Sequence, residues 1–228
     1  MKMCLKLLYY DFKEMGIGFL VPIIVAIGVT AYGVFIYCGA LINQESSAAL
    51  MVMNLFQYFI PPVSAWWIIM AFHRYAEEVG AEVFFTYGIS KKKTGIGRAL
   101  AFMAVIALLI FVIMILICLL GILKIGTAFT LFLIISVQSM LYGSFGFVFI
   151  LWLRNTVWSI TSILIIASLN IWGNIPVISK YLSITVRMQV QMSLLDVILK
   201  LIIMIIVSIA FFSKGQRFFS VLGEQKYG

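Results

Sequence analysis

The chain is poor in the residue types that a water-facing surface requires. Charged residues make up only 11% of its 228 residues, against about 25% in an ordinary soluble domain, and hydrophobic residues make up 64%. Because so few charges cannot cover a surface in water, most of the outer face must contact lipid. The net charge of +8 is then better explained by membrane topology than by a nucleic-acid partner, so no nucleic acid is expected.

Cysteine and histidine are also scarce. Cys4, Cys38 and Cys118 lie far apart and are odd in number, so the sequence predicts neither a disulfide framework nor a metal site. His73 is the only histidine and has no cysteine near it in the sequence, which disfavours it as a metal ligand. The chain also lacks G-x-S-x-G, and these absences together argue against an intramembrane enzyme.

Long apolar runs are what the chain does have. Six of them approach the roughly 20 residues that are needed to cross a bilayer core. They predict an all-α membrane protein with one transmembrane domain over residues 1–228. The first run is longer than the core of a signal peptide and follows acidic residues, so we expect it to be a retained span. The expected spans are 16–41, 51–72, 98–122, 127–151, 157–173 and 195–213.

Lysine and arginine are distributed unevenly between the two sides of these spans. Twelve of the sixteen lie on one side, in the N-terminal segment, the loop 73–98, the turn near 154 and the C-terminal tail. Three lie on the other side, and Lys200 lies inside the last span. Positive charge is retained on the cytoplasmic side, so both termini are predicted to be cytoplasmic.

Two segments outside the spans have amphipathic patterns. Lys2, Lys6 and Lys13 share one side of a helix over 1–15, which favours an interfacial helix on the cytoplasmic face; a frayed basic start is the alternative. The outer segment 173–195 is apolar but is interrupted by a proline and by charged residues. It favours either short helices that dip into the outer leaflet or an ordinary loop.

A few polar residues and two prolines lie inside the spans. Asn54 and Gln57 are three residues apart and share a face of the second span, and Gln138 lies near the middle of the fourth. These three side chains are candidates to line a path through the membrane, or alternatively to join helices by hydrogen bonds. Pro61 and Pro62 should kink or break the second helix.

The densest charge lies in the loop "EEVGAEVFFTYGISKKKTGIGRAL", residues 77–100. Glu78 and Glu82 are one helical turn apart with an apolar row beside them, which predicts a short helix over 77–90. The three lysines that follow would disfavour a helix start, so we interpret them as anchors on an anionic membrane surface. An exposed apolar patch rimmed by charge is typical of a docking site; a solvated loop is the alternative.

This run resembles the coupling segment of ABC-2 type transporter permeases. The family pattern is an acidic residue, a glycine, a glutamate two residues later, apolar residues, a proline or glycine, then serine and basic residues. Many members have proline where this chain has Gly88. The expected layout of interfacial helix, six spans and outer segment is similar as well. The matching residues are Glu78, Gly80, Glu82, Phe84, Phe85, Gly88, Ser90, Lys91 and Lys92.

The resemblance implies a transport subunit of a bacterial cell membrane. The short length and small outer loops are similar to those of members linked to peptide export or self-immunity. A coupling helix over 77–90 would sit on a separate ATPase subunit, and a second permease copy, identical or related, would complete an exporter of peptides, lipids or drugs. Its coupling residues would be Glu78, Gly80, Glu82, Phe84, Phe85, Tyr87, Gly88 and Ser90. Its membrane-surface residues would be Lys91, Lys92 and Lys93.

The chain also lacks a phosphate-binding loop motif, which agrees with a separate ATPase subunit. The nearest string to a phosphate-binding loop, "GISKKKTG", lacks the second glycine and a lysine in the required place. The chain is therefore expected to be no enzyme and to bind no cofactor, with ATP and Mg²⁺ held by the partner ATPase. The alternative is a membrane component of an ATP-driven importer, which would bind a small vitamin or metal as a single copy.

Overall fold

The computed structural model describes residues 2–42, 48–77, 94–172 and 194–225, and within these ranges the regular structure is entirely helical. A 3-10 turn, η1 (Gly16–Phe19), joins the first two helices. The helices are α1 (Lys2–Met15), α2 (Leu20–Ile42), α3 (Ala48–Glu77), α6 (Ile96–Leu119), α7 (Ile125–Leu153), α8 (Thr156–Trp172) and α10 (Leu194–Gln225).

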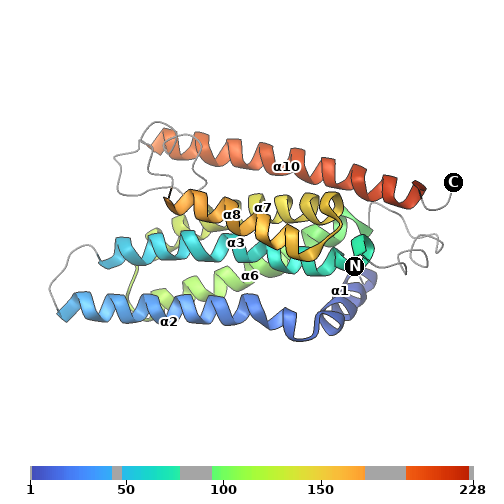
Figure 1. Cartoon of the computed structure of the whole chain (residues 1–228). Coiled ribbons are helices and arrows are strands. Elements are labelled where there is room, and N and C mark those ends of the chain that lie inside the picture. Colours follow the sequence, from blue (N-terminus) through green and yellow to red (C-terminus); the bar gives the residue numbers. More distant parts are fainter. Residues whose placement is uncertain (1, 43–47, 78–93, 173–193, 226–228) are drawn as a thin grey trace.

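The helices α2, α3, α6, α7, α8 and α10 lie side by side in one elongated bundle, whereas α1 lies at an angle across its end (Figure 1). The beginning of α1 and the end of α10 lie at that same end of the bundle (Figure 1). We call it the N/C end. The last residue of α3, the first residues of α6 and the turn between α7 and α8 lie there too, because successive helices alternate in direction.

Five described segments are long and apolar enough to cross a membrane: Tyr9–Gly39, Ala48–Glu77, Ile96–Leu119, Ile125–Leu153 and Leu195–Val221. The prediction of an all-α protein of membrane type is confirmed to that extent. The expected fifth span, 157–173, does not reach this length. The described helix α8 has 17 residues, or about 25 Å at 1.5 Å per residue, against a hydrocarbon core of about 30 Å.

The chain bends sharply between α1 and α2. Gly16 has a φ of +52°, a backbone conformation that costs glycine little and other residues more. The indole N–H groups of Trp66 and Trp67 on α3 donate to the carbonyl oxygens of Gly18 (3.0 Å) and Phe19 (2.9 Å). The Phe19 ring also stacks on the Trp67 ring, with centroids 5.4 Å apart. The bend is therefore fixed to the side of α3.

The two prolines do not break α3, which runs as one helix from Ala48 to Glu77. Pro61 and Pro62 each remove a backbone donor. The Ser64 hydroxyl lies within hydrogen-bond distance of the Pro61 carbonyl oxygen (2.5 Å) and of the Ser139 carbonyl oxygen on α7 (2.9 Å). Packing on several sides keeps the helix continuous, since two thirds of its apolar window is buried.

The centre of the bundle is the contact between α3 and α7. Two thirds of the apolar window of each is buried, compared with 22% for the first and last candidate spans. Small residues let the backbones approach closely: a Cβ placed on Gly146 would lie 3.0 Å from the Cβ and 3.2 Å from the carbonyl oxygen of Ala65. On α10, a Cβ on Gly215 would lie 2.5 Å from the ring of Phe147, which is fully buried.

Glycine-to-alanine substitutions test this packing. We expect Gly146→Ala and Gly215→Ala to lower the free energy of unfolding by about 1–3 kcal/mol, because a backbone or a buried ring must shift. Gly28→Ala on α2 meets nothing within 4 Å and should be neutral or stabilising by about 0.4–1 kcal/mol. Thermal unfolding in detergent measures all three, and equal losses at the three positions would contradict the packing described.

Candidate functional site

A group of buried polar side chains lies at the N/C end, where α1 meets the ends of α3 and α6. Its members are Asp11 near the end of α1, Tyr75 in the last turn of α3 and Arg98 in the first turn of α6. They are 4%, 7% and 5% exposed. We call these three residues the Arg98 cluster. A buried arginine and carboxylate are rare unless they are paired, so their contacts define the site.

Each of the three guanidinium nitrogens of Arg98 donates a hydrogen bond. Its Nε donates to one carboxylate oxygen of Asp11 at 2.5 Å, and its Nη2 donates to the other. Its Nη1 donates to the Tyr75 hydroxyl at 2.6 Å. The two parallel bonds to Asp11 form the bidentate arrangement that makes arginine–carboxylate pairs both strong and directional.

Aromatic rings surround the guanidinium. Its Cζ lies 5.4 Å from the centroid of the Phe72 ring and 5.0 Å from that of Tyr75. Phe219 on α10 packs edge-on against both rings, at 5.9 and 5.6 Å. These contacts add cation–π attraction to a buried guanidinium. The Arg98 cluster therefore joins α1, α3 and α6 directly and reaches α10 through Phe219.

A second ion pair joins α1 and α3 nearby. The Arg74 Nη1 lies 2.9 Å from the Glu14 carboxylate, but both side chains are more than 40% exposed. An exposed pair contributes little to stability, because water competes for both charges. It provides a natural comparison for the buried pair, since both pairs join an α1 carboxylate to an arginine, on α6 in the buried pair and on α3 in the exposed one.

Both described edges of the segment 78–93 are attached to the bundle. On one side, the Glu77 carboxylate accepts a hydrogen bond from the backbone N–H of Thr156, the first residue of α8. On the other side, the Ile96 N–H donates to the Gln216 side chain on α10 at 2.8 Å, and Arg98 follows two residues later. Side-chain acceptors thus satisfy helix N-terminal donors that have no partner within their own helices. Movement at these two edges would act directly on α8 and α10.

The predicted coupling residues fall within 78–93 and lie outside the described residues, as does almost all of the outer segment 173–195. Those residues are Glu78, Gly80, Glu82, Phe84, Phe85, Tyr87, Gly88 and Ser90, with the basic Lys91, Lys92 and Lys93. Their roles remain predictions. The structure adds the attachment of both edges of this segment, which the sequence did not indicate.

The polar residues predicted for a path lie between α3 and α7. Gln57 and Gln138 are 2% and 0% exposed, and the Gln138 Nε2 donates to the Gln57 Oε1 at 3.2 Å. Asn54 lies one turn away and is half-buried. In this conformation the two glutamines join α3 to α7 by a hydrogen bond, which is the second of the two alternatives that the sequence left open.

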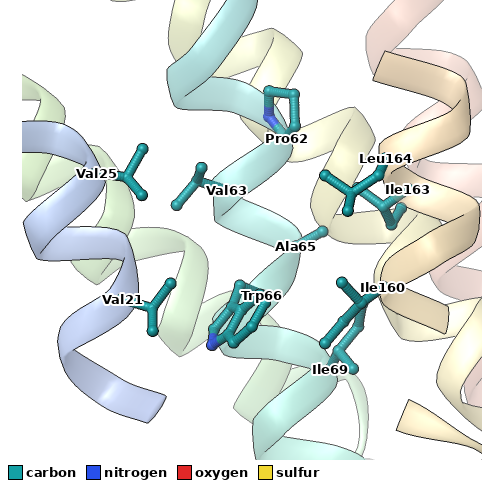
Figure 2. Close-up of a pocket in the computed structure, with 10 residues that line it drawn as sticks. All are labelled: Val21, Val25, Pro62, Val63, Ala65, Trp66, Ile69, Ile160, Ile163 and Leu164. Carbon is teal, nitrogen blue, oxygen red and sulfur yellow. The ribbon is translucent and has the colours of Figure 1, made fainter. Parts of the chain in front are cut away.

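An apolar cavity of about 180 Å³ lies between α2, α3 and α8. Figure 2 shows side chains from α2 and α8 on either side, with α3 between them. None of Asn54, Gln57 and Gln138 lines it. His73 is not near a ligand set either: its Nδ1 lies 2.6 Å from the Met70 carbonyl oxygen, and no metal-binding group is found among the described residues.

Sequence reasoning treated Arg98 only as a positive charge at a loop and Asp11 only as an acid before the first span. A stronger signal was available. Each is an ionisable residue flanked by apolar residues, in "YYDF" and "GIGRALAF", and such residues in or near a membrane usually have a partner. That signal indicates that a partner exists, but it does not identify a partner 87 residues away.

Comparison with known proteins adds no further evidence, because no protein-family model, curated protein or solved structure matches the chain.

Removing one member of the buried pair tests the Arg98 cluster. We expect Arg98→Leu to lower the free energy of unfolding by about 3–5 kcal/mol, because the Asp11 carboxylate is left buried without its counter-ion. The double variant Asp11→Leu with Arg98→Leu should recover much of that loss. Arg74→Leu breaks the exposed pair and should cost less than about 1 kcal/mol. Thermal unfolding in detergent gives the order, and an equal loss for Arg98→Leu and Arg74→Leu would contradict it.

Proposed function

We propose that the chain is the membrane-spanning permease subunit of an ATP-driven exporter of the ABC-2 type. The observation that best supports this is the attachment of the segment 78–93, which resembles the family's coupling segment. Its described edges are bound to α8 through Glu77 and to α10 through Ile96, and Arg98 connects them to α1 and α3. Both edges of the segment are thereby connected to other helices of the bundle.

The proposed topology has six passes, with α8 as a short one. The beginning of α1 and the end of α10 lie at one end of the bundle, as an even number of passes requires (Figure 1). The charge distribution favours a cytoplasmic position for that end. The family resemblance implies a multi-pass protein of a bacterial plasma membrane. A helix shorter than the hydrocarbon core can be accommodated by local thinning of the bilayer or by packing against neighbours.

In the proposed mechanism, the partner ATPase binds ATP with Mg²⁺ and moves the coupling helix 77–90. The Glu77 carboxylate transmits that movement to the N-terminus of α8, and the Gln216 side chain transmits it to α10. The Arg98 cluster makes α1 move with α3 and α6, because a buried bidentate pair resists separation. Lys91, Lys92 and Lys93 hold the segment at the anionic leaflet.

The cargo would be hydrophobic or amphipathic and would pass between two copies of the chain, identical or related. The described outer faces are apolar, which suits a peptide, lipid or drug of that kind. Gln57 and Gln138 are enclosed within one copy, so a path along them would require α3 and α7 to separate. Such a movement would expose amides that are otherwise bonded to each other.

The proposal predicts a partner. Purified from its native host in mild detergent with a tag at its C-terminus, the chain should bring down an ATPase subunit in about equal amount. The retained complex should hydrolyse ATP, whereas the chain expressed alone should not. Tight binding of a small vitamin or metal by a single copy, without a second permease, would favour the importer alternative and contradict the proposal.

Charge reversal in the coupling segment tests the coupling. We expect Glu82→Arg, which reverses a charge, or Phe84→Ala with Phe85→Ala, which removes two aromatic anchors, to weaken ATPase binding about tenfold or more. Losing an interfacial charge contact or an aromatic anchor commonly costs ~2 kcal/mol. Folding should be unchanged, while transport and its stimulation of ATP hydrolysis are lost together. Lys124→Glu is the matched control, since it reverses an exposed charge at the opposite end of the bundle. Unchanged coupling in the Glu82 variant would count against the assignment.

A further inference from the structure

None of the residues that line the cavity between α2, α3 and α8 belongs to the Arg98 cluster or to the sequence segment 77–93. Val21 and Val25 line the cavity on α2, Pro62 and Val63 on α3, and Ile163 and Leu164 on α8 (Figure 2). We propose that this cavity holds one acyl chain of a membrane phospholipid. The proposal goes beyond the transport function, because it depends only on the described helices lying in a bilayer.

The chemistry of the lining selects a hydrocarbon. All ten lining residues are apolar or aromatic. The one side-chain donor among them is the indole N–H of Trp66, and it already donates to the Gly18 carbonyl oxygen at 3.0 Å. Pro62 has no backbone N–H to offer. A buried water needs two to four polar partners, so water is poorly held here, whereas a methylene chain needs none.

The size of the cavity favours a single chain. Its volume of about 180 Å³ compares with the ~150 Å³ of an apolar cavity that binds benzene, a molecule of six carbons. An α-helix with its side chains is about 10 Å across, which is too wide for a space of this volume. The cavity therefore suits several methylenes of one chain better than a helix of a second copy. Left empty, its lining would lose dispersion contacts.

The surroundings make a membrane lipid the source of that chain. Leu164 on the α8 wall is 56% exposed, and Ile24 and Ile27 beside the α2 wall are 62% and 63% exposed. These α2 residues belong to the candidate span Tyr9–Gly39, where hydrocarbon replaces water as solvent. Val21 lies close to the bend at the N/C end, so the lipid belongs to the leaflet at that end.

Lipid retention provides the first test. The full chain is reconstituted with phosphatidylcholine, purified in mild detergent and examined by native mass spectrometry. We expect one tightly retained phospholipid per chain in the wild type and at least tenfold less in Val25→Phe and Val63→Phe, which fill the cavity. Ile27→Phe adds the same ring to an exposed position of α2 and should retain lipid as the wild type does.

Two outcomes would overturn the proposal. One is equal lipid retention in the filled and control variants. The other is a wild-type dimer that carries no lipid and dissociates in Val25→Phe, which would identify a second copy as the occupant.

A second measurement uses the unmodified chain, so it does not depend on whether a variant folds. Vesicles of phosphatidylcholine are doped with a phosphatidylcholine that carries a diazirine in its acyl chain, and the adducts formed in light are mapped by mass spectrometry. We expect adducts on Val63 or Trp66 of α3, which α2 and α8 flank. Adducts confined to outward residues such as Ile27, with none on Pro62, Val63 or Trp66, would refute the site.

Discussion

The bidentate contact between Arg98 and Asp11 is the interaction on which the N/C end of this structure depends. Both groups are almost completely buried, and each would be costly there without the other. Because Asp11 lies on α1 and Arg98 on α6, α1 must cross the end of the bundle for the two charges to meet. The bend at Gly16 and the two indole bonds to η1 permit that crossing. The exposed Glu14–Arg74 pair also joins α1 to α3 in this position, but an exposed pair is too weak to fix the position of α1.

A different constraint holds the middle of the bundle together. There α3 and α7 meet through small residues such as Ala65 and Gly146, and through the Gln57–Gln138 hydrogen bond. Helix association in lipid draws on close packing and interhelical hydrogen bonds rather than on the hydrophobic effect, and this contact provides both. The first and last candidate spans are only about one fifth buried, so their apolar faces remain available to lipid or to another subunit.

The sequence was most informative where one local property decides the outcome. Apolar length located five of the six expected spans, because a long run such as 98–122 has few other stable structures in a membrane. Apolar length was less informative at α8, because its 17 described residues are fewer than the roughly 20 that cross a bilayer core. Pro61 and Pro62 were weighted by their local effect alone, and tertiary packing kept α3 continuous. The pairing of Asp11 with Arg98 could not be derived, since a charge reveals its need for a partner but not which distant residue meets it.

The cluster and the cavity share α3, and this links two regions that appear independent in sequence. One face of α3 carries Tyr75 to the Arg98 cluster, while Trp66, between two and three turns earlier, lines the cavity and holds Gly18 at the bend. Trp67 holds the next carbonyl, and its ring stacks on that of Phe19. A rotation of α3 large enough to open the cavity would therefore strain both indole bonds to the bend. An occupant that fits the cavity as it stands would stabilise the same orientation of α3 that the hydrogen bond between Arg98 and Tyr75 requires.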